Sequence, residues 1–271
     1  MSLEHKLLNR EGYSIHYFVS GNADSVVDAD TETIVFLHPA FGDHNCFSDQ
    51  VDFFLPKYRL IMVDMLGHGL SKVGRSKDRI DKTPEHILEI MRLEGVERAH
   101  VVGVSMGSLI AQYFALQNPE MVLSLTALGG YTINRVNREI AKSQRKEIFK
   151  WLFKMIFSMD SFRRYVAGVT LVDKGAQARF YESAKGFSRK SFTIMTGVDK
   201  LIANRDTPQR NYPLMIAVGE KDSALARGIS LKWHEEEPRS RFYLIEGAGH
   251  CANMDRAEQF NELLFEFIRD Y

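Results

Sequence analysis

The segment Ala99–Gln117, AHVVGVSMGSLIAQYFALQ, changes from a strand pattern to a helix pattern across one short turn. Its first half is rich in valine, which is typical of a strand buried on both faces. Its second half repeats apolar residues at helical spacing. Between the halves, Gly103 and Gly107 flank Ser105 at positions where a side chain would collide with neighbouring backbone. The segment therefore predicts a sharp strand-to-helix turn that presents the Ser105 hydroxyl.

This turn has the GxSxG pattern of a nucleophile elbow, which reads GVSMG here. The helix that follows directs unpaired N–H groups and the positive end of its dipole at the same spot. Negative charge forming on a substrate oxygen would be stabilised there, and the Met106 N–H is the first expected donor. We therefore interpret Ser105 as a catalytic nucleophile and not only as part of a glycine-rich turn.

Short apolar runs typical of strands alternate with helical patterns along the rest of the chain. The runs are TIVFLHP, RLIMVDM, VLSLTALGG, PLMIAVGEKD and RFYLIEGAGH. At the start, HKLLN and YSIHYFVS predict a hairpin at the edge of the sheet, with its turn at Glu11 and Gly12. Strands that alternate with helices imply parallel pairing. The predicted fold class is α/β, with a doubly wound, mostly parallel sheet.

Capping signals predict where two of the helices begin. Thr83 is the expected N-cap of a helix over residues 84–94, with Pro84 in its first turn. The last helix is expected to begin near Asp255, because the spacing from Asp255 to Glu258 fits a capping box.

Residues 132–208 interrupt the alternation, because they contain helical patterns and no convincing strand. They hold sixteen Lys or Arg and seven Asp or Glu, so their net charge of +9 balances −9 on the remainder. Within them, IFKWLFKMIFSMDSF interleaves Phe, Met and Trp with cations, which predicts an amphipathic lid over an apolar pocket. We expect a core domain of residues 1–131 and 209–271 and a helical cap of residues 132–208.

The overall composition favours a small molecule as the main partner. Basic and acidic residues number 35 each, so net charge does not indicate nucleic acid or an anionic membrane. Cys46 and Cys251 are too few for a disulfide framework and have no metal-ligand spacing. Neither a signal peptide nor a membrane-spanning run is visible. We expect a cytoplasmic protein, and the sequence identifies no protein partner.

A serine nucleophile requires a histidine to accept its proton and a carboxylate to orient that histidine. Asp222 follows one predicted strand and His250 follows the next, so both lie at the edge of the sheet where the elbow sits. Glu220 and Asp255 are competing carboxylates in nearby turns. We choose Ser105, His250 and Asp222 as the expected triad.

Five motifs in register make the chain resemble the α/β-hydrolase superfamily over nearly its whole length. They are HPAFG, where HGxxG is usual, DMLGHGLS, which matches DxxGxGxS, and then GVSMG, GEKD and GAGH. The order Ser, Asp, His is also that of the superfamily. The resemblance implies an α/β-hydrolase fold that requires no metal or organic cofactor.

The resemblance also implies roles for residues around the elbow. Ala40 would supply the second oxyanion N–H, with Phe41 as the alternative, from a loop in which Pro39 replaces the usual glycine. His38 would brace this loop, whereas Asp64 and His68 would belong to a structural loop. Cys251, next to His250, would be a bystander.

Serine at the elbow argues against the dehalogenases and epoxide hydrolases of the superfamily, which carry an aspartate there. It predicts acyl transfer to water from a substrate with an apolar part, and thus hydrolysis of a carboxylic ester or related acyl bond. The same triad would serve lactones, thioesters or carbon–carbon bonds next to a ketone. An acyltransferase or perhydrolase, and a ligand-sensing or regulatory protein with little turnover, are the alternatives.

Overall fold

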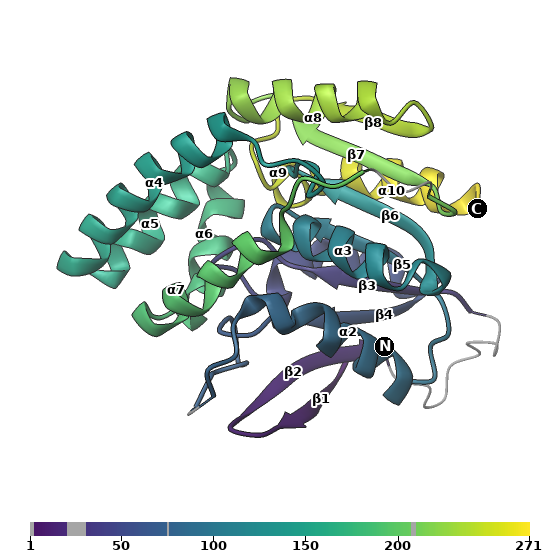
Figure 1. Cartoon of the computed structure of the whole chain (residues 1–271), viewed down its shortest axis with the longest axis horizontal. Coiled ribbons are helices and arrows are strands. Elements are labelled where there is room, and N and C mark those ends of the chain that lie inside the picture. Colours follow the sequence, from purple (N-terminus) through teal and green to yellow (C-terminus); the bar gives the residue numbers. More distant parts are fainter. Residues whose placement is uncertain (1–2, 21–30, 75, 207–209) are drawn as a thin grey trace.

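The structure, a computed structural model, describes residues 3–20, 31–74, 76–206 and 210–271. They form one eight-stranded sheet with helices on both faces (Figure 1). The strand order is β1-β2-β4-β3-β5-β6-β7-β8, in which β1, β2 and β4 pair antiparallel and the other pairs are parallel. The predicted α/β fold class with a doubly wound, mostly parallel sheet is confirmed.

The strands follow the apolar runs of the sequence. Their bounds are β1 Leu3–Arg10, β2 Tyr13–Ser20, β3 Thr33–Leu37, β4 Arg59–Val63, β5 Ala99–Val104, β6 Val122–Leu128, β7 Leu214–Gly219 and β8 Ser240–Ile245. Every residue of β3, β5 and β7 is buried, because helices cover both faces of the sheet there. The expected N-terminal hairpin forms β1 and β2, and Gly12 takes a φ of +83° in its turn.

Helices fill the connections between the strands. The α-helices are α1 Ser48–Phe54, α2 Thr83–Leu93, α3 Met106–Gln117, α4 Arg138–Phe157, α5 Met159–Thr170, α6 Lys174–Ser183, α7 Arg189–Met195, α8 Ala224–Glu236, α9 Ala252–Asp255 and α10 Ala257–Arg269. The 3-10 turns are η1 His44–Phe47, η2 Ile80–Lys82, η3 Pro119–Met121, η4 Ala184–Gly186 and η5 Thr196–Leu201. Within the described ranges, none of the helices is long and apolar enough to cross a membrane.

Helices α2 and α10 each begin within two residues of the expected start, but both predicted caps are wrong. Helix α2 begins at Thr83 itself, because the 3-10 turn η2 leads directly into it and places Lys82 at the N-cap. Helix α10 begins at Ala257, and Asp255 instead ends the short helix α9. The Asp255 carboxylate accepts hydrogen bonds from backbone N–H groups elsewhere, so a tertiary contact replaces the expected capping box.

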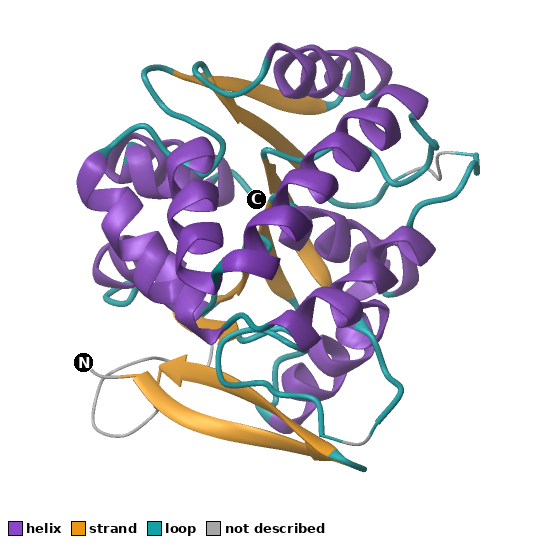
Figure 2. Ribbon diagram, turned by 90° about the vertical axis from the view of Figure 1, so that its left-hand side faces the viewer, coloured by secondary structure: helices purple, strands orange, loops and turns teal. Residues whose placement is uncertain are grey.

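Residues 132–208, called the insertion below, contribute α4 to α7 and no strand among their described residues. In Figure 1 these helices lie at one side of the sheet, and Figure 2, viewed from that side, shows them in front. The two ends of the insertion run side by side. The Ala203 N–H donates to the Ile133 carbonyl and the Arg205 N–H to the Asn134 carbonyl, each at 3.0 Å.

Candidate active site

Ser105 occupies the turn between β5 and α3 in a strained backbone conformation. Its φ of +53° is rare for a residue with a side chain. A Cβ at Gly103 would lie 2.4 Å from the Gly107 carbonyl oxygen, and one at Gly107 would lie 2.1 Å from the Leu37 carbonyl oxygen. Glycine is therefore required on both sides of the serine. The collision with neighbouring backbone expected from the sequence at these two positions is present.

The structure brings together the three side chains expected to form a triad. His250 Nε2 lies 2.8 Å from Ser105 Oγ, and His250 Nδ1 lies 2.7 Å from Asp222 Oδ2. Asp222 follows β7 and His250 follows β8, so the carboxyl ends of neighbouring parallel strands supply both groups. The competing carboxylates do not take this place: Glu220 accepts from the Gly247 N–H.

The loop that carries His250 is held from several directions. The His250 N–H donates to the Thr170 carbonyl at 2.8 Å, and the Gly249 N–H donates to Asp255 Oδ2 at 2.7 Å. A Cβ at Gly129, after β6, would lie 3.2 Å from the His250 ring, so the strand end packs closely against it. The imidazole is thus positioned by the sheet, by α9 and by the end of α5 in the insertion.

Electrostatics in this trio favour an ionised carboxylate and a basic imidazole. Burial opposes ionisation of Asp222, but the charge and hydrogen bond of His250, with the Ser223 N–H and Arg227, lower the pKa of the carboxyl. Burial likewise opposes protonation of His250, yet the Asp222 carboxylate outweighs it and raises the pKa of the imidazole. A carboxylate only accepts, so Nδ1 carries the proton and Nε2 is left to accept from the Ser105 hydroxyl.

Backbone donors are available next to the serine. A Cβ at Gly107 would also lie 2.7 Å from the His38 carbonyl oxygen, so the elbow touches the loop after β3 directly. Within the described ranges, the N–H groups of Ala40, Phe41 and Met106 donate to no protein acceptor. All three candidates from the sequence are therefore free to bind a substrate oxygen. Phe41 has a φ of +72°, a second strained backbone beside the elbow.

The His38 side chain links the loop after β3 to the loop after β4. Its ring is fully buried, its Nε2 accepts from the Met65 N–H at 3.0 Å, and its Nδ1 lies 2.8 Å from the Pro39 carbonyl oxygen. Because Nε2 accepts, Nδ1 carries the proton and donates to Pro39. Burial lowers the pKa of His38, so the neutral ring ties two loops together. This geometry is that of a bracing residue.

The DMLGHGLS motif forms a tight loop around Asp64. Its carboxylate accepts from the His44 N–H, from the His44 ring and from the Leu70 N–H, all within 2.9 Å. A Cβ at Gly69 would lie 2.2 Å from Asp64 Oδ2, so a side chain at this position would displace the carboxylate. His68 is buried in the same loop, and burial lowers its pKa to about 3. Among the described residues, no hydrogen bond or ring contact joins Asp64 or His68 to Ser105 or His250.

Aromatic side chains of the insertion cover the loop after β3. The Phe41 ring meets those of Trp151, Phe162 and Phe187 edge-on, with ring centroids 5.0 to 5.2 Å apart. Edge-to-face contacts at this separation are favourable beyond the apolar area that they bury. The insertion is therefore packed onto a residue that is itself one of the candidate oxyanion donors.

Sequence reasoning missed the residues that position the trio. Thr170 and Asp255 hold the loop of His250, and the Arg227 guanidinium donates to the backbone carbonyls of Glu220 and Asp222. None of these residues belongs to a sequence motif. Thr170 and Asp255 act on loops of other segments, and Arg227 acts from helix α8 on the turn that precedes it. Only the packing of the chain reveals them.

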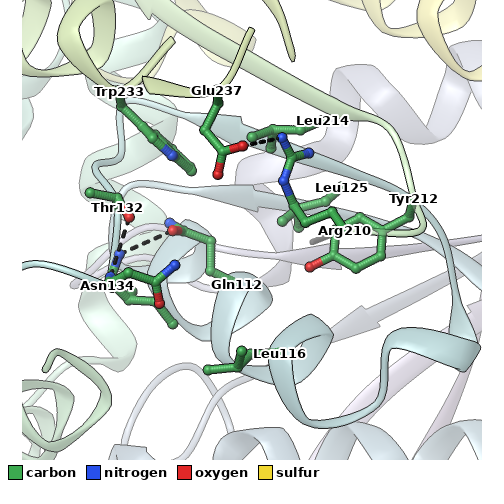
Figure 3. Close-up of a pocket in the computed structure, with 11 residues that line it drawn as sticks. Gln112, Leu116, Leu125, Thr132, Asn134, Arg210, Tyr212, Leu214, Trp233 and Glu237 are labelled. Carbon is green, nitrogen blue, oxygen red and sulfur yellow. Dashed lines mark hydrogen bonds and ion pairs between the residues drawn. The ribbon is translucent and has the colours of Figure 1, made fainter. Parts of the chain in front are cut away.

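A separate small cavity lies beside the two ends of the insertion and is lined by none of the trio (Figure 3). Its volume is about 30 Å³, and it is walled by the ion pair of Arg210 and Glu237. Arg210 Nε and Asn134 Oδ1 face no partner among the described residues. This volume suits ordered water and not a substrate. Nor do the described His, Cys, Asp and Glu side chains form a metal-binding group.

Comparison with known proteins finds hydrolases among the proteins that this chain resembles. A family model described as alpha/beta hydrolase fold matches residues 32–155. A 2-hydroxy-6-oxononadienedioate/2-hydroxy-6-oxononatrienedioate hydrolase from a Pseudomonas species is 26% identical, over 94% of this chain and 92% of its own length. A putative 2-succinyl-6-hydroxy-2,4-cyclohexadiene-1-carboxylate synthase from Bacillus subtilis is 24% identical, over 88% of this chain and 90% of its own length.

Solved structures resemble the whole chain. A thermophilic esterase from Thermogutta terrifontis superposes with a TM-score of 0.81, at 14% identity and 98% coverage of both chains. The 2-hydroxy-6-oxo-6-phenylhexa-2,4-dienoate hydrolase from Rhodococcus superposes with a TM-score of 0.75, at 17% identity and 99% coverage of both. At such identities the likeness establishes the fold.

Proposed function

Because this chain belongs to the α/β-hydrolase fold superfamily, we propose that it is a serine hydrolase that cleaves a carboxylic ester or a related acyl bond. One observation carries the proposal, the hydrogen-bond chain from Asp222 through His250 to Ser105. It ends at a strained turn with free N–H groups beside it. This arrangement provides a nucleophile, a general base and an oxyanion site within one constellation.

In the first half of the proposed reaction, His250 Nε2 takes the proton of the Ser105 hydroxyl as Oγ attacks the substrate carbonyl. The tetrahedral oxyanion accepts hydrogen bonds from the Met106 N–H and from the N–H of Ala40 or Phe41. The imidazolium then gives its proton to the leaving group. An acyl-enzyme and a free alcohol result, or a free thiol where the substrate is a thioester.

In the second half, His250 takes a proton from water while the water oxygen attacks the acyl-enzyme. Return of that proton to Ser105 Oγ releases the carboxylic acid and regenerates the enzyme. The Asp222 carboxylate keeps the imidazole in the tautomer that both halves need and stabilises its charged form. These steps use only the chain's own groups and water.

We propose that the insertion, residues 132–208, is a cap over a core domain of residues 1–131 and 209–271. The edge-on contacts of Trp151, Phe162 and Phe187 with Phe41 support this role, because they put apolar helices next to the oxyanion loop. A substrate that reaches Ser105 beneath these rings would bury its apolar part there. A small molecule with an apolar acyl or alkyl group is the expected partner.

Hydrolysis of a carbon–carbon bond next to a ketone is a second candidate, which the similarity to the Pseudomonas hydrolase favours. The substrate in that protein's name carries two carboxylates, an enol and a ketone but no ester. Its hydrolysis must therefore break a bond between carbon atoms. The same trio could serve such a reaction.

The deciding experiment measures turnover of p-nitrophenyl esters from acetate to laurate by the wild type and by Ser105→Ala. We expect the variant to lose roughly 10³- to 10⁶-fold in kcat. Ser48→Ala, at an exposed serine in α1, is the matched control and should keep wild-type activity. A 2-hydroxy-6-oxo-dienoate assayed in parallel by loss of its dienol absorbance tests the second candidate.

The outcomes separate the candidates. Ester turnover that depends on Ser105, with no loss of the dienol, supports the ester hydrolase. Loss of the dienol at a higher kcat/KM than any ester favours carbon–carbon cleavage. Ester turnover that survives Ser105→Ala would contradict the assigned nucleophile, and a wild type inert on both substrate classes would direct attention to ligand sensing.

A further inference from the structure

Helix α4 carries a row of large apolar side chains that face solvent. Phe149 and Phe157 are 74% and 72% exposed, and between them Leu152, Phe153 and Ile156 are also exposed. Their spacing puts all five on one face of the helix. We call these five residues the α4 stripe. Monomeric proteins rarely leave contiguous apolar patches uncovered, so the stripe indicates a partner.

The opposite face of α4 is packed, so the exposure does not come from a detached helix. Ile140 and Met155 are buried, and the Trp151 ring lies against Phe41. The Arg189 guanidinium donates to the Met155 carbonyl at 2.7 Å and ties the end of α4 to α7. Helix α4 is thus apolar on two sides, of which one is already covered by protein.

Cations extend the same face towards the N-terminal end of α4. Arg138, Lys142 and Arg145 precede Phe149 at helical spacing and are exposed. In the described part of the chain, none of the three forms an ion pair. The outward face therefore has a cationic first half and an aromatic second half. It belongs to an insertion with a net charge of +9, at one side of the molecule (Figure 1).

We propose that the α4 stripe docks onto an anionic lipid surface. Apolar side chains on one face of a helix enter the boundary between headgroups and acyl chains, while nearby cations attract anionic headgroups. The first half of the outward face provides the cations, and the second half provides the apolar side chains. The total charge of zero does not indicate an anionic membrane, but three exposed cations, Arg138, Lys142 and Arg145, lie on the same face of α4 as the stripe.

A second copy of the chain fits this face less well. If two α4 helices packed stripe to stripe, each would bring Arg138, Lys142 and Arg145 and the surrounding insertion, with its charge of +9, against an equally positive surface. Such like-charge contacts oppose association. An anionic lipid surface meets the same cations with opposite charge.

Co-sedimentation with vesicles tests the proposal. We expect the wild type to bind vesicles of phosphatidylcholine with about 30% phosphatidylserine, and to bind pure phosphatidylcholine at least about fivefold more weakly. Phe153→Ser combined with Phe157→Ser should weaken binding at least about tenfold. Lys142→Ala combined with Arg145→Ala should weaken it by about fivefold per cation, and added salt should reduce the wild-type binding.

Matched controls use the same substitutions away from α4. Leu7→Ser with Leu244→Ser removes two exposed leucines from β1 and β8, and Lys77→Ala with Lys232→Ala removes two exposed lysines outside the insertion. Both controls should bind as the wild type does. Failure of the wild type to bind anionic vesicles, or equal binding by all variants, would overturn the proposal.

Sedimentation velocity tests whether a second copy of the chain covers the α4 stripe instead of lipid. A concentration-dependent dimer that the double phenylalanine variant abolishes, without vesicle binding, would assign the α4 stripe to a second copy and contradict lipid docking. Far-ultraviolet circular dichroism and urea unfolding of each variant serve as the folding check. This assay of binding is independent of whether Ser105 is the nucleophile.

Discussion

The sheet and the insertion meet at Phe41 and at the loop of His250 but are built in different ways. Strands β3, β5 and β7 are buried along their whole length, and backbone atoms approach so closely that only glycine fits at 103, 107 and 219. Helix α4 of the insertion instead packs one apolar face on the protein and exposes the other. The difference shows that close backbone packing fixes the strand ends that carry the proposed triad, whereas α4 has a face that no described part of the chain covers.

The largest expected effect comes from a change at the sheet edge that leaves the fold intact. Asp222→Asn keeps the size of the side chain but cannot hold the imidazole in the required tautomer. We expect kcat for the preferred ester to fall by about 10⁴-fold. Glu220→Gln, two residues earlier, is the control and should stay within a few-fold of wild type. A loss of kcat below tenfold in Asp222→Asn would contradict the role of Asp222 in orienting His250.

Stability should distinguish the two faces of the insertion. Phe162 is fully buried against Phe41 and Phe187, so Phe162→Ala should lower the free energy of unfolding by about 3 to 5 kcal/mol. Phe157→Ala removes a side chain of the same size from the α4 stripe and should change the free energy of unfolding by less than about 0.5 kcal/mol. Urea unfolding measures both. Equal losses would mean that the stripe is covered by protein in solution.

The pH profile gives the smallest effect and probes the coupling of Asp222 to His250. Only the neutral imidazole accepts the proton of Ser105, so activity should rise with pH through the pKa of His250, at about tenfold per unit on the acid limb. Because Asp222 raises that pKa, the midpoint should lie above 6.5. In Asp222→Asn, burial alone acts on the ring, and the limb should move to lower pH. An unchanged midpoint would contradict the coupling.

Much of the sheet and the trio could be predicted because their signals are local. A strand that ends in a glycine-flanked serine, or in GEKD or GAGH, carries its information within a few residues. The wrong cap at Asp255 has the opposite cause, a contact between distant segments. The spacing of Asp255 and Glu258 fits a capping box, but the backbone N–H groups of Val172 and Gly249 reach the Asp255 carboxylate through the fold.

The orientation of α4 could not be read from its sequence either. Residues 148–162 were expected to lay one apolar face over a pocket, and Trp151 and Met155 do face the protein. Apolar residues also fill the outward face, so the periodicity of the segment does not say which side is covered. That depends on what the sheet places beneath the helix, which is a property of the whole chain.

The adjacent ends of the insertion make it an exchangeable cassette. Because the chain leaves near Ile133 and returns near Ala203, with a backbone hydrogen bond of 3.0 Å between them, a short peptide could close the gap without moving β6 or β7. Helices of another length or pattern could be grafted at this seam. The strands of the sheet could be inherited unchanged through such an exchange, provided that the new segment again offers a backbone carbonyl where that of Thr170 accepts from the His250 N–H.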